Sequence, residues 1–165
     1  MNYKVRNSQH ISRNCLVCGV ENPFGLKTRF YETEQDELVA VFKPVSEHQS
    51  YPDVTHGGIS AAILDEVIGR AIMMTTDSDT FGVTVELVVR YKKPVPLDSE
   101  LKVVGRRDRG RLFEGTGELY LPNGEIAVEA EGKYMKRRLE QITDKNFSQN
   151  EWFIPEDDLP DEISV

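Results

Sequence analysis

The segment with the clearest chemical potential runs from His56 to Glu66, with the sequence HGGISAAILDE. Gly57 and Gly58 stand where an apolar helical pattern begins, so the N–H groups of the first turn are open to a closely approaching ligand. These groups lie at the positive end of the helix dipole, where negative charge is stabilised. Glycine pairs before helices are also common turn chemistry, so the pair alone does not define a site.

Asp65 is the second chemical feature of this segment. On a helix, its neighbours three, four and seven residues away are apolar or small, namely Ala61, Ala62, Ile68, Gly69 and Ile72. A carboxylate on such a face costs free energy unless it is paired or used, and burial tends to raise its pKa, which suits a general base or a protonated hydrogen-bonding group. The alternative is a paired structural carboxylate. The small neighbours either admit a ligand or a second backbone close to the helix, or pack against a sheet.

Glu66, with Arg70 four residues further on, is interpreted as an ordinary surface ion pair.

Two further sets of residues have types that bind ligands. Cys15 and Cys18 have metal-ligand spacing, but no second cysteine pair follows and His10 is off the pattern, so zinc is not expected from one chain. A site shared across a dimer and a redox pair both stay open. His48 lies in the loop before the helix and is expected either to line the pocket or, more commonly, to lie on the surface.

The elements that must position these residues follow from hydrophobic periodicity. Alternating segments at 26–32 and 37–43 predict a hairpin, and apolar residues spaced by three and four predict one helix over 57–76. Further strands are predicted at 83–93, 100–107, 112–121 and 126–136, with a turn at Asn123–Gly124. The order of two strands, one long helix and four strands predicts an α+β domain in which one antiparallel sheet packs on a central helix.

Composition bounds the class of protein. The 165 residues, 39% of them hydrophobic, make about one soluble globular domain, and a net charge of −8 argues against a general nucleic-acid binder. The longest apolar run, 59–74, is interrupted by charges, so no membrane span is expected. The N-terminus lacks the features of a secretory signal, which predicts a cytoplasmic protein with reduced cysteines. No motif of a serine hydrolase, a nucleoside triphosphatase or a dinucleotide-binding enzyme is present.

Basic residues gather in the second half of the chain. Strand 83–93 is predicted to present Thr84, Glu86, Arg90 and Lys92 on one side, and Arg107, Arg109 and Arg111 follow around a hairpin turn. Arginine and lysine suit phosphates, and in an acidic protein a local basic cluster favours a small anionic ligand over a polymer. A solvated sheet edge guarded by charges is the alternative.

Taken together, these motifs resemble the hotdog-fold acyl-CoA thioesterases of the PaaI-like group. The resemblance rests on His56-Gly57-Gly58 with an Asp nine residues after the histidine, on TVELVVRYKKPVP, on CLVCGVENPFGL and on GRLF at 110–113, and it covers about residues 14–137. It implies a hotdog fold, in which a sheet of five to six strands wraps the helix, and a homodimer or homotetramer with no cofactor. The chain then divides into an N-terminal arm with the cysteines (1–25), the hotdog domain (26–138) and an acidic tail (139–165). The tail is expected to be solvated or disordered, with Trp152–Ile154 as a candidate docking segment.

The same resemblance implies roles for individual residues. The amide of Gly57, with that of Gly58, would polarise the thioester carbonyl in a site completed by Asp65 of the other protomer, acting as general base or as nucleophile. His56 would be a structural or pocket-edge residue. The remaining substrate contacts would be Thr84, Arg90, Lys92 and Arg111, the last three at the phosphates of coenzyme A. The expected function is metal-independent hydrolysis of a small to medium acyl-CoA thioester. The alternative is a non-catalytic binder of acyl-CoA or a small metabolite, and a dehydratase is a weaker third reading because its Asp and His pairing is not evident.

Overall fold

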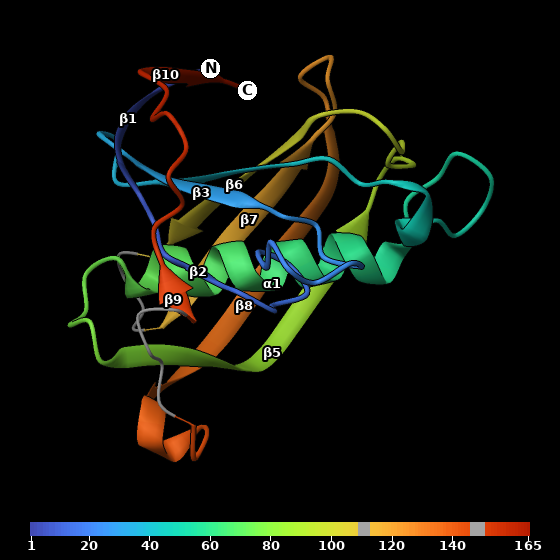
Figure 1. Cartoon of the computed structure of the whole chain (residues 1–165). Coiled ribbons are helices and arrows are strands. Elements are labelled where there is room, and N and C mark those ends of the chain that lie inside the picture. The colour runs from blue at the N-terminus through green and yellow to red at the C-terminus, as the bar shows by residue number, and fades with distance from the viewer. Residues whose placement is uncertain (109–112, 146–150) are drawn as a thin grey trace.

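One long helix, α1 (Gly57–Met73), lies across a curved antiparallel sheet (Figure 1). The computed structural model describes residues 1–108, 113–145 and 151–165. Within them the sheet has eight strands, in the order β10 (Glu162–Ser164), β1 (Asn2–Ser8), β3 (Arg29–Thr33), β4 (Leu38–Phe42), β6 (Leu101–Arg107), β7 (Glu114–Tyr120), β8 (Ile126–Arg138) and β5 (Thr80–Tyr91). A separate pair joins β2 (Ile11–Ser12) to β9 (Trp152–Phe153), and short 3-10 helices span Ser46–His48 and Leu139–Gln141. This architecture is the predicted hotdog fold.

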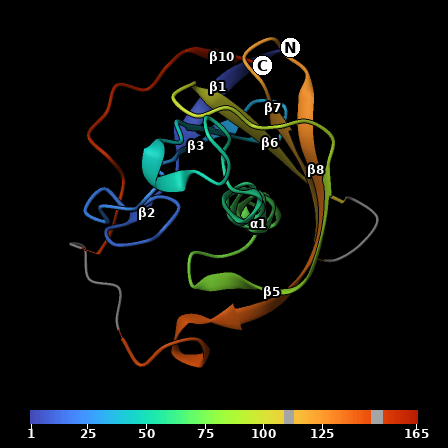
Figure 2. The ribbon, with the colours of Figure 1, turned by 90° about the vertical axis from the view of Figure 1, so that its right-hand side faces the viewer.

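The main core lies between α1 and the concave face of the sheet, which curves around the helix when viewed along its axis (Figure 2). The helix buries one continuous stripe, which includes Ile63, Leu64, Val67, Ile68, Ala71 and Ile72. Glycines on the facing strands make room for it. A Cβ at Gly105 of β6 would lie 2.6 Å from Val67 Cγ1, and one at its β7 neighbour Gly117 would lie 3.0 Å from Leu64 Cδ2. The helix therefore packs closer to β6 and β7 than side chains there would allow.

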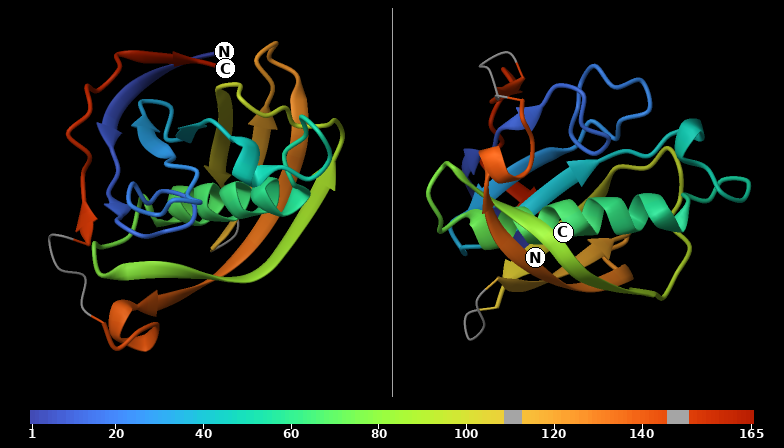
Figure 3. Two further views of the ribbon diagram at one scale, coloured as in Figure 1. Left: turned by 45° about the vertical axis from the view of Figure 1, so that its right-hand side comes forward. Right: turned by 90° about the horizontal axis from the view of Figure 1, so that it is seen from below.

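A second, smaller core covers the opposite face of the sheet. Tyr3, Tyr31, Val39, Val104, Tyr120 and Ile163 form it. Tyr3 and Ile163 come from the two ends of the chain, where β1 and β10 pair antiparallel in the register Tyr3 to Ile163. The termini therefore lie side by side, as Figures 1 and 3 show.

The structure confirms the predicted hairpin, helix and four following strands, with ends shifted by a few residues. The predicted count of five to six strands is too low, because β1 and β10 extend the sheet at one edge.

The expectation of a solvated or disordered tail is wrong for β9 and β10, whereas docking of Trp152–Phe153 is confirmed by the pairing with β2. Short terminal strands carry little periodicity, and Ile163 is held by the second core rather than by its neighbours in sequence. The domain boundaries near 25 and 138 stay a prediction.

Among the described residues, no helix has the length and apolarity that crossing a lipid bilayer requires.

The glycine packing can be tested with Gly105→Ala. The added methyl would meet the backbone oxygen of Val67 at 2.8 Å, so we expect the free energy of unfolding to fall by about 1–3 kcal/mol. Urea unfolding followed by circular dichroism measures this change. Lys102→Ala on the same strand, which removes a partly exposed side chain, is the control and should stay within about 0.5 kcal/mol of the wild type. Equal stability of Gly105→Ala and the control would contradict the close packing.

Candidate active site

The start of α1 is capped by His56, which adopts extended backbone angles (φ −60°, ψ 135°). Its Nδ1 accepts a hydrogen bond of 2.8 Å from Gly58 N–H. The Gly57 N–H, in contrast, has no acceptor among the described residues. Of the two predicted amide donors, Gly57 is therefore the one left open, and His56 has a structural role as the helix cap.

Tyr91, at the end of β5, holds Gly57 in place. Its hydroxyl donates a hydrogen bond of 2.7 Å to Gly57 O, and a Cβ at Gly57 would lie 3.3 Å from its ring. A hollow of about 380 Å³ opens beside this contact and includes Lys92 and Lys93 in its lining. Tyr91 is not among the site residues predicted from the sequence, although it ends the alternating pattern of this strand.

Asp65 lies eight residues further along α1 and is half-buried. Its Oδ1 accepts hydrogen bonds from Thr84 Oγ1 at 2.8 Å and from the Tyr134 hydroxyl at 3.0 Å. The same hydroxyl is 2.7 Å from the backbone oxygen of Asp65, so its proton is shared between two acceptors. Oδ2 has no hydrogen-bond partner among the described residues and is available at the cavity that Asp65 lines.

Tyr134 of β8 is the second residue that sequence analysis missed. Its ring is buried against two glycines. A Cβ added at Gly69 of α1 would lie 3.0 Å from this ring, and one added at Gly132 of β8 would lie 2.6 Å from it. Burial, followed by the charge of Asp65, raises the pKa of the Tyr134 phenol, which therefore stays protonated and donates. Gly69 thus serves packing against the sheet. A glycine two residues before an aromatic on one face of a strand is the signal that would have drawn attention to it.

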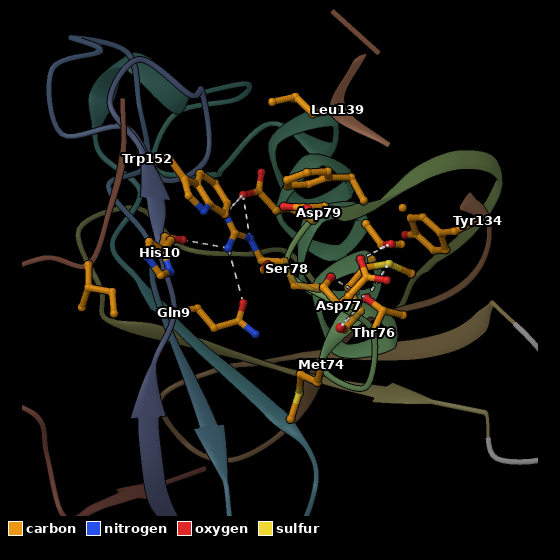
Figure 4. Close-up of a pocket in the computed structure, with 18 of the residues that line it drawn as sticks. Gln9, His10, Met74, Thr76, Asp77, Ser78, Asp79, Tyr134, Leu139 and Trp152 are labelled. Carbon is orange, nitrogen blue, oxygen red and sulfur yellow. Dashed lines mark hydrogen bonds and ion pairs between the residues drawn. The ribbon is translucent and has the colours of Figure 1, made fainter. Parts of the chain in front are cut away.

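The cavity beside Asp65 has a volume of about 1490 Å³. Asp65, Thr84 and Tyr134 supply polar groups, and its apolar lining includes Met73, Met74, Phe81, Trp152, Ile154 and Leu159. In Figure 4, Tyr134 lies on one side of the view and Trp152, stacked on His10 with ring centroids 5.6 Å apart, lies on the other. Part of the acidic tail therefore forms a wall of this cavity.

A β-bulge in β5 changes which polar residues share a face. The register with β8 shifts between Thr84 and Glu86, so Thr84 points to the helix while Glu86 points away and pairs with Lys133 at 2.7 Å. The predicted single polar face of strand 83–93 is wrong for this reason.

The predicted phosphate contacts are consequently separated from one another. Arg90 pairs with Glu131 at 2.6 Å on the outer face and lines neither of the two hollows, whereas Lys92 pairs with Glu129 and lines the smaller one. Arg111 and Arg109, with most of the GRLF segment, lie outside the described residues. Their contacts with phosphate stay predictions.

His48 lies neither in a cavity lining nor on the surface, and both placements predicted for it are wrong. It is 3% exposed, its Nδ1 accepts from Val45 N–H at 2.9 Å, and its Nε2 lies 2.8 Å from Phe24 O. A buried imidazole with both nitrogens hydrogen-bonded ties two loops together.

Replacing Tyr134 by phenylalanine tests how the phenol is held. Below pH 10 we expect the wild type to be more stable by about 0.5–1.5 kcal/mol, the net value of one hydrogen bond. The pKa of the Tyr134 phenol is raised above 10.0 in the folded protein, so as pH rises this phenol ionises first in the unfolded chain. Above pH 10 the wild type therefore loses its stability advantage over Tyr134→Phe, by about 1.4 kcal/mol per pH unit. Urea unfolding at several pH values measures the difference. Tyr51→Phe, which changes a 75% exposed phenol, is the control and should be as stable as the wild type at every pH. A stability difference between Tyr134→Phe and the wild type that does not change with pH would contradict the raised pKa.

Comparisons with known proteins place the segment around α1 and the fold among proteins of known class. Residues 53–109, which include α1, match the family model described as Thioesterase superfamily. An uncharacterized protein of Schizosaccharomyces pombe is 31% identical over 97 residues, which are 58% of this chain and 55% of that protein. This chain therefore spans just over half the length of that relative.

Solved structures share the architecture. A thioesterase superfamily protein aligns with a TM-score of 0.67 and 26% identity over 74% of this chain and 60% of that one. A thioesterase from Haemophilus influenzae aligns with a TM-score of 0.63 and 12% identity over 74% of this chain and 86% of the other, which concerns the fold alone. These comparisons show that the chain has the hotdog fold and that its segment 53–109 is similar to the thioesterase superfamily.

Proposed function

We propose that this protein hydrolyses the thioester of a small to medium acyl-CoA, in an active site shared by two protomers. The observation that carries the proposal is the Asp65 carboxylate, which Thr84 and Tyr134 hold by one oxygen at the wall of a large, partly apolar cavity. The thioesterase superfamily match supports the class of reaction.

The two proposed catalytic groups are too far apart to serve one substrate within a single chain. Gly57 and Asp65 are eight residues apart on one helix, which at about 1.5 Å per residue separates them by about 12 Å. A carbonyl oxygen and the carbon to which it is bonded lie much closer together than this. A complete site therefore needs the Gly57 amide of one protomer and the Asp65 carboxylate of its partner.

The position of β5 supplies a way to bring the two together. β5 lies at one edge of the sheet, where its outer backbone groups can pair with a second strand. Its Thr84 contacts Asp65 and its Tyr91 contacts Gly57. If two β5 strands pair antiparallel about an axis between residues 87 and 88, Thr84 of one protomer lies opposite Tyr91 of its partner. Asp65 then faces the open amide across the interface.

Each group has a defined task in the reaction. The Gly57 N–H, at the positive end of α1, would stabilise the negative charge that develops on the thioester oxygen. Asp65 would either take a proton from the water that attacks the carbonyl carbon, or attack that carbon itself to form an anhydride that water then hydrolyses. In both routes the carbon–sulfur bond breaks and coenzyme A leaves as the thiolate, which takes up a proton from water or from Asp65, so that the carboxylate is ionised again at the end of the cycle.

The coenzyme A portion would lie near the smaller hollow. Lys92 and Lys93 line it beside Gly57, and both side chains are more than 40% exposed, so they can exchange their carboxylate partners for phosphates. The larger cavity, with Met73, Phe81 and Trp152, would receive the acyl group.

Asp65→Asn tests the proposed base or nucleophile. We expect kcat for acyl-CoA esters to fall by about 100- to 10,000-fold, because the amide can neither accept a proton nor attack. Release of free thiol from a panel of acyl-CoA esters measures the rate. Glu86→Gln, which removes an exposed carboxylate on the outer face of β5, is the matched control. Unchanged turnover in folded Asp65→Asn would contradict the assignment, and saturable binding without hydrolysis in the wild type would indicate the non-catalytic binder instead.

Gly57→Pro tests the amide donor and the shared site. Proline removes the N–H and suits the first helical position, and the extended backbone of His56 is compatible with a following proline. We expect kcat to fall by about 100- to 1,000-fold, whereas Gly57→Ala retains the donor and most of the rate.

Mixing the two inactive variants gives the decisive measurement. Refolding Asp65→Asn with Gly57→Pro in equal amounts should restore about one quarter of wild-type activity, since half of the dimers then carry one intact site. Chains refolded separately and then combined without exchange serve as the control. No recovery in verified heterodimers would overturn the shared site.

A further inference from the structure

We propose that Cys15, Cys18 and Glu66 form a metal site that binds one zinc ion per chain. The two cysteines alone lack a further ligand in the sequence, and the fold supplies one from α1. The two sulfurs and one carboxylate oxygen all lie within 4.8 Å of one another. Glu66 follows Asp65 on α1 and lines the same cavity, but its carboxylate contacts Cys15, whereas that of Asp65 contacts Thr84 and Tyr134.

The distances suit a tetrahedral zinc ion. Zinc lies about 2.3 Å from thiolate sulfur and about 2.0 Å from carboxylate oxygen, so a tetrahedral angle places these two atoms about 3.5 Å apart. The distance between Cys15 Sγ and Glu66 Oε2 is 3.5 Å. This pair of atoms therefore already has the separation that a tetrahedral ion requires.

The backbone around the cysteines is wound so that its N–H groups point at the sulfurs. Val17 N–H and Cys18 N–H lie 3.3 and 3.5 Å from Cys15 Sγ, and Ser12 N–H lies 3.4 Å from Cys18 Sγ. Gly19 permits this turn, because a Cβ there would lie 2.5 Å from Cys15 O. Such donors stabilise thiolate, the form of cysteine that binds metal.

Zinc would bind both sulfurs as thiolates, so the thiol protons of Cys15 and Cys18 would be released to water when the ion binds.

Glu66 is held in the orientation that a ligand requires. Arg70 Nε and Nη2 donate to its Oε1 at 2.9 and 2.8 Å, which leaves Oε2 directed toward Cys15. Arg70 is itself fixed by a hydrogen bond of 2.9 Å to His10 O and by stacking 4.1 Å above the Phe30 ring. The prediction that Glu66 and Arg70 form an ordinary surface ion pair is wrong, because their side chains are only 21% and 13% exposed. Such outer partners fix the orientation of metal ligands.

The ligand chemistry favours zinc over magnesium and calcium. Two thiolates and one carboxylate are ligands that zinc accepts, whereas magnesium and calcium require oxygen ligands. Three protein ligands leave one coordination position for water. The ion would join the loop at 12–19 to α1 at Glu66, the residue after Asp65. It would therefore stabilise the loop and its position on the helix.

Zinc binding by the 165-residue chain tests the proposal. Protein kept reduced and stripped with a chelator is titrated with zinc chloride, and bound metal is measured by elemental analysis. We expect about one zinc per chain and a higher melting temperature with zinc. Cobalt in place of zinc should give thiolate-to-metal charge-transfer absorption and the visible bands of tetrahedral coordination.

Three variants and one control make the assignment specific. Cys15→Ser and Cys18→Ser should abolish stoichiometric binding, and Glu66→Gln should weaken it at least about 10-fold. Glu21→Gln, which changes an exposed carboxylate shortly after the cysteines that pairs with Arg13 at 2.6 Å, should bind as the wild type does. Circular dichroism checks that each variant folds. No zinc in the reduced wild type, equal binding by Glu66→Gln and Glu21→Gln, or cobalt spectra without thiolate bands would each overturn the site.

Discussion

Close packing of α1 against β6, β7 and β8 is the constraint on which the other features depend. Gly105 and Gly117 let the apolar stripe of the helix sit against the sheet, and Gly69 and Gly132 leave room for the ring of Tyr134 between helix and strand. The phenol can donate to Asp65 only because this ring fits there. The same glycines that shape the core thus decide where the carboxylate of the site is held.

The strand β5 connects the two ends of the candidate site. Thr84 near its beginning contacts Asp65, and Tyr91 at its end contacts Gly57. The bulge between Thr84 and Glu86 is what allows Thr84 and Tyr91 both to face the helix. A strand at the sheet edge that holds both groups explains why a second copy of this strand is the proposed route to a complete active site.

Both terminal segments contribute to the structure around α1. The loop with Cys15 and Cys18 contacts the helix through Glu66, and Trp152 of the tail lies over Arg70, with its ring 5.3 Å from the guanidinium carbon. The tail also forms a wall of the larger cavity. The segments before β3 and after β8 therefore line the larger cavity as well as extend the sheet.

The sequence by itself determined the helix, its glycine start and the succession of central strands, because periodicity depends on neighbours a few residues apart. It also singled out Asp65, since spacing alone shows a carboxylate on an apolar helical face. Only the tertiary structure decided that Thr84 and Tyr134 contact Asp65, from 19 and 69 residues away, and that Glu66 meets Cys15 from 51 residues away. Such contacts depend on strand register, on a one-residue bulge and on how closely helix and sheet approach, and local periodicity encodes none of these.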